Sequence, residues 1–149
     1  MNINSQKINS DSAENTAQIA VELAKKFTKK GGIILFEGEL GAGKTFFTQS
    51  FMKYFQITEK VNSPTFLLQK QYSIPNSDRI IFHLDLYRLS EPVDLQSTGI
   101  TELFDQIASN IVLIEWSEKI SKKDLPVSFT KVSIEKSGIE KRIITITEY

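Results

Sequence analysis

The segment IILFEGELGAGKT at residues 33–45 decides the fold of this chain. Its first four residues are wholly apolar, which is typical of a parallel strand covered on both faces. The segment ends in G-x-x-x-x-G-K-T over residues 38–45, and Phe47, Phe51 and Phe55 then recur at helical spacing. A strand, a glycine-rich loop and a helix in this order predict an α/β fold.

The glycine-rich loop has the chemistry of a phosphate-binding loop. Its three glycines let the backbone bend so that successive N–H groups converge on phosphate oxygens. The helix that follows offers its positive N-terminus to the same anion. Lys44 can reach the β- and γ-phosphates, and the Thr45 hydroxyl is suited to bind Mg²⁺. The alternative, a chance glycine-rich turn, arises in about one chain in a hundred of this length, so we predict a nucleoside triphosphate site.

Composition excludes several other classes of protein. The 149 residues carry 18 basic and 18 acidic side chains, so no net charge draws the chain to nucleic acid or membranes. The absence of cysteine excludes a disulfide scaffold and a thiolate metal site. The longest wholly apolar runs have four residues, too few to span a bilayer, and the first eighteen residues lack the apolar segment of a secretory signal. These observations predict one cytoplasmic domain over residues 1–149.

Hydrophobic periodicity predicts the remaining elements. Residues 12–30 have helical spacing, and Asp11 and Glu14 have the spacing of a capping box before them. The other expected elements are a hairpin with arms 66–74 and 80–86, a short helix from 90 to 99, a buried strand at 111–114 and a C-terminal hairpin with arms 127–135 and 142–147. Together they predict a P-loop NTPase fold of three layers, with a mixed sheet that contains antiparallel hairpins.

The register of the first hairpin follows from its turn. If the chain turns between Asn76 and Ser77, the numbers of paired residues sum to about 153, although a slip of two stays open. Thr65 then lies opposite Arg88, close to the carboxyl end of the second arm. Because Pro64 stiffens this stretch, Thr65 is a candidate sensor of the γ-phosphate or of the attacking water.

Two predicted strands end in a carboxylate, as a magnesium and triphosphate site requires. Asp85 ends one of them and shares a face with His83, whereas Glu115 directly follows four apolar residues of the other. Asp85 as a plain surface acid remains an alternative. Glu115 is typical of the carboxyl edge of a parallel sheet, where α/β proteins bind ligands. His83 is more typical of a hydrogen-bonded structural residue, and Trp116 fits either the core or a stacking position on the base.

Four motifs in order resemble the TsaE family, small bacterial P-loop ATPases needed for threonylcarbamoyladenosine modification of tRNA at position 37. They are GELGAGKT at 38–45, SPTF at 63–66, HLDLYRL at 83–89 and IEW at 114–116. The P-loop alone is shared by many families, whereas the combination of SPTF with H-x-D-x-Y-R-L is specific. The resemblance runs from about residue 11 to residue 116.

The resemblance implies roles for individual positions. The residues expected to wrap the phosphates are Gly41, Ala42, Gly43, Lys44, Thr45 and Phe46. Thr45 and Glu115 would hold Mg²⁺, Asp85 would be the essential acid, Thr65 would belong to a switch-like segment, Trp116 would lie beside the nucleotide and Thr16 near the adenine. The chain departs from the family at Ile139, because a basic residue can follow the glycine of the last hairpin there. Lys141 and Arg142 are the possible substitutes.

The resemblance also implies a function. The family hydrolyses ATP weakly alone and works with TsaB and TsaD, of which TsaD carries out carbamoyl transfer to tRNA. With only three arginines, this chain is not expected to bind tRNA tightly by itself. Two alternatives stay open, a small-molecule kinase and a nucleotide-gated binding module with little turnover. The kinase would need a lid over the phosphates, and no lid-sized insert separates the motifs.

Overall fold

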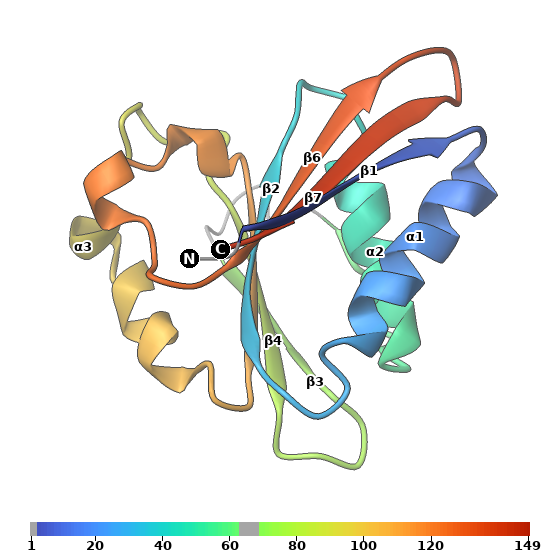
Figure 1. Cartoon of the computed structure of the whole chain (residues 1–149). Coiled ribbons are helices and arrows are strands. Elements are labelled where there is room, and N and C mark those ends of the chain that lie inside the picture. The colour runs from blue at the N-terminus through green and yellow to red at the C-terminus, as the bar shows by residue number, and fades with distance from the viewer. Residues whose placement is uncertain (1–2, 63–68) are drawn as a thin grey trace.

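The computed structural model describes residues 3–62 and 69–149, which form a seven-stranded mixed sheet (Figure 1). The strand order is β1-β7-β6-β2-β5-β4-β3. Strands β6, β2, β5 and β4 run parallel, whereas β7, β1 and β3 are antiparallel to their neighbours. The bounds are β1 Asn4–Ser10, β2 Gly32–Glu37, β3 Gln69–Ser73, β4 Ile80–Asp85, β5 Ile111–Glu115, β6 Thr130–Lys136 and β7 Arg142–Glu148.

Helices cover both faces of this sheet and give the three predicted layers. Figure 1 shows α1 (Ala13–Lys25) and α2 (Lys44–Tyr54) together on one face, and α3 (Leu95–Thr98) on the other. Three 3-10 helices complete the second side, η1 (Ile100–Gln106), η2 (Ser117–Lys119) and η3 (Lys122–Asp124). The predicted α/β architecture with a mixed sheet and antiparallel hairpins is confirmed.

The central strands are buried on both faces, as their apolar sequences predict. On β2, Ile34 and Phe36 belong to the hydrophobic core beneath α1 and α2, whereas Ile33 and Leu35 pack on the side of α3 and η1. All four side chains are at most 2% exposed. This double burial holds β2 in the middle of the sheet, and the loop after it therefore starts from a rigid position.

The predicted register of the first hairpin is confirmed where it is described. Gln69 pairs with Leu84 and Ser73 with Ile80, so each pair of residue numbers sums to 153. The SPTF segment at 63–66, and with it the predicted position of Thr65, lies outside the described residues.

Helix α1 differs from its prediction at both ends. Its N-cap is Ser12, whose hydroxyl accepts a hydrogen bond from the Asn15 N–H, and Asp11 lies one residue earlier. The helix ends at Lys25 instead of continuing to residue 30. Beyond its end, the guanidinium of Arg79 donates hydrogen bonds to carbonyl oxygens of the connection to β2. Those acceptors are Phe27, Thr28 and Lys30.

Two further elements depart from the sequence pattern. Strand β1 was not predicted, because its residues are mostly polar and exposed, and only its pairing with β7 along the edge makes it a strand. Helix α3 begins after Asp94, whose side chain accepts from the Gln96 N–H, rather than at residue 90, and it ends at Gly99 as predicted. The segment after Gly99 continues as η1, for which periodicity gave no signal.

Candidate functional site

The glycine-rich loop joins the carboxyl end of β2 to the first turn of α2, as the sequence predicts. Gly43 is the N-cap of α2 and has a φ of 110°, a left-handed conformation that residues with a side chain rarely adopt. At Gly38 an added Cβ would lie 2.6 Å from the carbonyl oxygen of Ile134. The two glycines therefore let the backbone turn tightly against β6 and enter the helix with its N–H groups exposed to a ligand.

Lys44 lies along this loop and is nearly buried. Its Nζ donates hydrogen bonds to the carbonyl oxygens of Gly38 and Glu39, the second at 3.1 Å. The same ammonium group stands 3.8 Å from the centroid of the Trp116 ring, a cation–π contact. Burial lowers the pKa of Lys44, and the carboxylate of Glu118 is the strongest of several acids that oppose this shift. Lys44 is thus held at the loop, beside the place where phosphates would lie.

Thr45 and Glu115 are in direct contact. The Thr45 hydroxyl donates to Oε1 of Glu115 over 2.8 Å, which links the start of α2 to the end of β5. The other carboxylate oxygen, Oε2, lies 2.8 Å from Nε2 of His83. Glu115 is only 1% exposed. The structure thus brings together Thr45 and Glu115, which the sequence predicted to share one site, although nothing in the pattern required them to touch.

Asp85 and Glu115 lie side by side at the carboxyl ends of two parallel strands. The register pairs Asp85 on β4 with Glu115 on β5, and Phe36 on β2 follows on the far side of Glu115. One carboxylate oxygen of Asp85 accepts a hydrogen bond from the Tyr87 N–H at 2.9 Å. Both acids therefore belong to the sheet edge next to the glycine-rich loop, where parallel α/β sheets bind ligands.

The oxygen groups at this edge suit a hard cation such as Mg²⁺. Hydroxyl and carboxylate oxygens are the ligands that Mg²⁺ prefers, and it usually takes few of them from the protein and the rest from phosphates and water. Thr45 and Glu115 supply such oxygens next to the glycine-rich loop. Within residues 3–62 and 69–149, no group of three or more His, Cys, Asp or Glu side chains could form a complete metal cage. This donor set fits a metal that arrives with a nucleotide.

Trp116 was predicted either to belong to the core or to stack on the base, and its position lies between these alternatives. It is the residue after Glu115, adopts a left-handed φ of 61° and is half-buried. Its ring packs on Tyr87 with centroids 5.0 Å apart, and it lies 3.8 Å from the ammonium of Lys44 and 6.0 Å from that of Lys119. Trp116 also packs against the hydrophobic cluster on the side of α3 and η1, so it borders both the site and the core.

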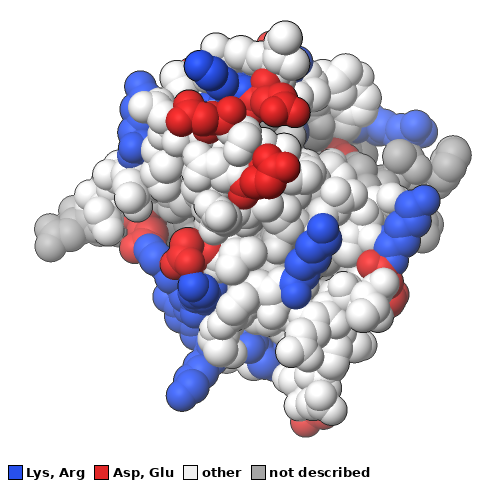
Figure 2. Space-filling view, turned by 90° about the vertical axis from the view of Figure 1, so that its right-hand side faces the viewer, with Lys and Arg blue, Asp and Glu red and all other residues white. Residues whose placement is uncertain are grey.

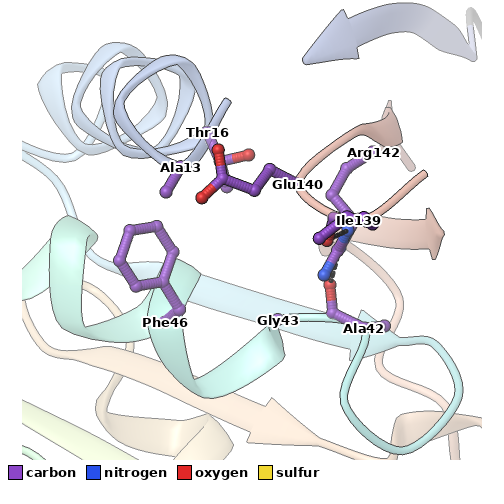
Figure 3. A pocket seen from close by; sticks show the side chains of 8 residues that line it. All are labelled: Ala13, Thr16, Ala42, Gly43, Phe46, Ile139, Glu140 and Arg142. Carbon is purple, nitrogen blue, oxygen red and sulfur yellow. Dashed lines mark hydrogen bonds between the residues drawn. The ribbon is translucent and has the colours of Figure 1, made fainter. Parts of the chain in front are cut away.

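A pocket of about 150 Å³ lies next to Ala42 and Gly43 of the loop. It lies between α1, the start of α2 and the turn that joins β6 to β7 (Figure 3). The residues that line it are Ala13, Thr16, Ala42, Gly43, Phe46, Ile139, Glu140 and Arg142. Figure 3 shows the side chain of Glu140 extending across the opening toward Thr16, with the ring of Phe46 on the opposite wall.

Hydrogen bonds determine whether the Thr16 hydroxyl donates to a ligand or accepts from it. The Ser10 hydroxyl donates to the carbonyl oxygen of Ser12 at 3.0 Å, and its oxygen lies 2.6 Å from Oγ1 of Thr16. Because Ser10 has a single hydroxyl proton, the Thr16 proton is the one donated between the two hydroxyls. The Thr16 oxygen therefore offers an acceptor, and not a donor, to a ligand in the pocket.

Arg142 is the basic residue of the last hairpin that reaches the pocket. Its Nε donates to the carbonyl oxygen of Ala42 at 2.7 Å, and its Nη1 donates to carbonyl oxygens of its own turn, at Gly138, Ile139 and Lys141. Lys141 is not among the lining residues. Of the two possible substitutes for a basic residue after Gly138, the structure therefore brings only Arg142 to the pocket, and in a backbone-binding position.

The structure separates the predicted residues into two groups. Lys44, Thr45, Asp85, Glu115 and Trp116 gather at the sheet edge. Thr16, Ala42, Gly43 and Phe46 line the pocket, while Gly41 lies in the loop next to Ala42. Sequence reasoning did not identify Ala13, Glu140 or Glu118, because none belongs to a motif. For Glu118 the only available signal was its place three residues after Glu115.

Glu118 adds a further acid beside the loop. Burial raises the pKa of its carboxyl group, although the N–H groups of Glu118 and Gly38 and the charge of Lys44 act in the opposite direction.

Within the described chain, no helix is both long and apolar enough to cross a membrane.

Comparison with known proteins assigns the chain to one family. The family model described as "Threonylcarbamoyl adenosine biosynthesis protein TsaE" matches residues 10–144. The chain is 37% identical over 146 residues to the tRNA threonylcarbamoyladenosine biosynthesis protein TsaE of Rickettsia bellii, with 95% of this chain and 97% of the relative covered. The protein of the same name from Bacillus subtilis is 36% identical over 134 residues, with 90% and 80% covered.

A solved structure has the same fold. The crystal structure of Bacillus subtilis YdiB superposes with a TM-score of 0.77 at 30% sequence identity, and the match covers 99% of this chain and 88% of that chain. Because the match covers 99% of this chain, it includes strand β1 and the C-terminal hairpin.

Proposed function

This chain belongs to the TsaE family and takes part in threonylcarbamoyladenosine biosynthesis on tRNA, and we propose that it does so as an ATP-binding and ATP-hydrolysing subunit. The observation that carries this proposal is the contact between Thr45 and Glu115 directly beside Lys44. A loop threonine bonded to the acid that ends a buried parallel strand is the arrangement that a Mg²⁺–triphosphate complex requires.

The loop and its lysine would bind the phosphates. The N–H groups at the start of α2 are directed away from the helix and carry its positive dipole, which favours a bound anion. Lys44 is already held against the loop by carbonyl groups, so little rearrangement is needed to bring its charge onto the β- and γ-phosphates. Preorganised charge of this kind stabilises a transition state without further reorganisation.

Thr45 and Glu115 would hold Mg²⁺ together with the phosphates. The Thr45 proton is donated to Glu115, so the lone pairs of its oxygen remain available to a cation. When bound, the metal would neutralise charge on the β- and γ-phosphate oxygens. Asp85, beside Glu115, would orient the attacking water or the second shell of the metal, and Thr65 would sense the γ-phosphate.

The nucleoside would occupy the pocket between α1 and the β6–β7 turn. Its walls combine the Phe46 ring with the acceptor oxygen of Thr16 and the carboxylate of Glu140. Acceptors match the exocyclic amine of adenine, which supports ATP as the nucleotide. Trp116 would report on the phosphate side of the site rather than stack on the base.

Partner proteins would couple ATP hydrolysis by this chain to the modification of tRNA. On the face that α1 and α2 cover, basic and acidic side chains are interspersed (Figure 2), a distribution that does not favour tight binding to the tRNA backbone. We therefore propose TsaB and TsaD as the partners, with this chain driving a conformational change in their assembly.

A phosphate-release assay tests the proposal. ATP hydrolysis by the purified chain should be weak and should rise when TsaB and TsaD are added, whereas the Lys44→Ala variant should remain at background in both conditions. Binding of ATP without release of phosphate, alone or with the partners, would instead favour a nucleotide-gated module. Transfer of phosphate to a small molecule would favour a kinase.

A second measurement tests the assignment of partners. Repeated rounds of tRNA modification by TsaB and TsaD should require this chain and ATP. Tight, salt-sensitive binding of tRNA by the isolated chain, or modification that is indifferent to its addition, would contradict the proposed role.

A further inference from the structure

His83 lies on β4 in contact with the acid of the proposed metal site. Its Nε2 is 2.8 Å from Oε2 of Glu115, and the two side chains are 0% and 2% exposed. The pair therefore lies behind the site, away from solvent, where a hydrogen bond is stronger than at the surface.

The direction of this hydrogen bond follows from the acceptor. An ionised carboxylate can only accept, so the proton of the bond is on Nε2 of His83. The other ring nitrogen, Nδ1, is buried and has no hydrogen-bond partner among the described residues. A buried nitrogen without a partner destabilises the fold, so the histidine is not explained by its contribution to packing alone.

The two carboxylate oxygens of Glu115 therefore have different hydrogen-bond partners. Oε2 is bound by His83 on β4, and Oε1 is bound by the Thr45 hydroxyl at the start of α2. With both oxygens engaged, the carboxylate cannot rotate freely about its terminal bond. Without the histidine, only the Thr45 contact would fix its plane.

We propose that His83 is a positioning residue that orients the Glu115 carboxylate toward Thr45 and the metal that enters with the nucleotide. This inference rests on the proposed function, because it assumes that Glu115 acts on Mg²⁺. Partners that orient metal-binding groups commonly contribute about 10- to 100-fold to metal affinity. His83 itself touches neither the nucleotide nor the metal in this arrangement.

A purely structural role for His83 makes a different prediction. Leu113 on β5 is paired with His83 in the sheet register and is also fully buried, but it forms no polar contact with the site. If His83 only fills space, replacing either residue should affect stability and leave the metal dependence of nucleotide binding unchanged. Leu113→Val is therefore a matched packing control.

The experiment measures the affinity of the full chain for a non-hydrolysable ATP analogue by calorimetry, in excess Mg²⁺ and in excess chelator. The affinity in excess Mg²⁺ divided by the affinity in excess chelator is the ratio that reports the contribution of the metal. His83→Leu should lower this ratio by about 10- to 100-fold, mainly through weaker binding in Mg²⁺. His83→Gln should restore most of the ratio, because glutamine carries an N–H donor at the same number of bonds from Cβ. Leu113→Val should leave the ratio unchanged.

A second pair of variants avoids dependence on the folding of His83→Leu. The amide of His83→Asn is one bond shorter than that of His83→Gln and does not reach Glu115, although both are polar. We expect a low ratio for asparagine and a high one for glutamine. Equal ratios in these two variants, or a wild-type ratio in folded His83→Leu, would overturn the assignment of His83. A wild-type chain whose binding ignores Mg²⁺ would instead contradict the proposed function itself.

Discussion

The Nε atom of Arg142 lies 2.7 Å from the carbonyl oxygen of Ala42, so the first residue of β7 is bonded directly to the glycine-rich loop. Three further carbonyl oxygens of the β6–β7 turn accept from the same guanidinium. One side chain thus fixes both the loop and the turn that contribute residues to the pocket.

Arg142→Ala should reduce the free energy of unfolding and weaken nucleotide binding. Hydrogen bonds from a charged group contribute about 1.5–3 kcal/mol each when well formed, and because Arg142 is only half-buried we expect about 1–2 kcal/mol for the whole cluster. Urea denaturation measures the loss. Lys141→Ala, at the neighbouring exposed position, should change stability by less than about 0.5 kcal/mol. Equal losses in the two variants would contradict the role of Arg142.

Lys44→Ala should abolish most nucleotide binding while the fold persists. The variant removes the only side-chain cation in the loop and also removes a buried charge, whose desolvation lowers the pKa of Lys44. We therefore expect at least a 10-fold loss of ATP affinity, or about 1.4 kcal/mol, without a fall in the midpoint of thermal unfolding. Calorimetric titration and a melting curve on the same preparation measure both. Unchanged ATP affinity would refute the phosphate-loop assignment.

Glu115→Gln and Asp85→Asn should impair different steps. Glu115→Gln removes a charge next to Thr45, so binding of Mg²⁺·ATP should weaken more than binding of metal-free ATP. Asp85→Asn should reduce hydrolysis more than binding, because Asp85 would act on the attacking water or on the groups around the metal ligands rather than on the metal itself. Paired titrations with Mg²⁺ and with chelator, together with phosphate release, separate the effects. The reverse pattern would exchange the two roles.

Trp116 should report nucleotide binding by fluorescence. It is the single tryptophan of the chain, and its ring contacts the ammonium of Lys44 at 3.8 Å. A nucleotide that draws this charge onto its phosphates changes the surroundings of the indole, so ATP and ADP should change its emission. The change should be lost in Lys44→Ala. A flat titration under conditions in which calorimetry detects binding would place the indole outside the responsive part of the site.

Glu118→Gln should stabilise the nucleotide-free chain at neutral pH. Although Glu118 is an exposed residue, desolvation of its carboxyl group raises its pKa above the ordinary value of 4.5, so the ionised carboxylate is disfavoured in the folded state. This destabilisation is present above the folded-state pKa and disappears as the pH falls through it, because the folded chain then takes up a proton. Thermal midpoints of the two proteins should therefore converge on acidification. Glu59→Gln, at an exposed position outside the site, serves as a control, and a difference that grows at low pH would contradict the prediction.

The sequence predicted the parts of the molecule whose patterns are local. Residues 33–45 were sufficient for β2, the loop and the start of α2, because an apolar run and a glycine motif each have a strong structural preference. The turn around Asn76 predicted the register of β3 and β4. By contrast, β1 is polar, and its strand conformation depends on β7 at the far end of the sequence.

The candidate site, too, was predicted only where its sequence pattern is local. Alternation along β4 correctly put His83 and Asp85 on one face, but the hydrogen bond from His83 to Glu115 depends on β4 and β5 being neighbours, which their sequences do not state. The pocket could not be predicted as a whole, because Thr16 and Glu140 come from opposite ends of the chain and meet only through the sheet order.

The edge position of β1 has a consequence for synthesis on the ribosome. In the described sheet, β7 is the only strand that pairs with β1, and almost the whole chain separates the two. The first strand therefore emerges long before the partner that completes its hydrogen bonds, and a contact of such high sequence separation slows folding. The turn that closes the pocket is made equally late. Nascent chains should thus display a finished phosphate loop well before they can enclose a nucleoside.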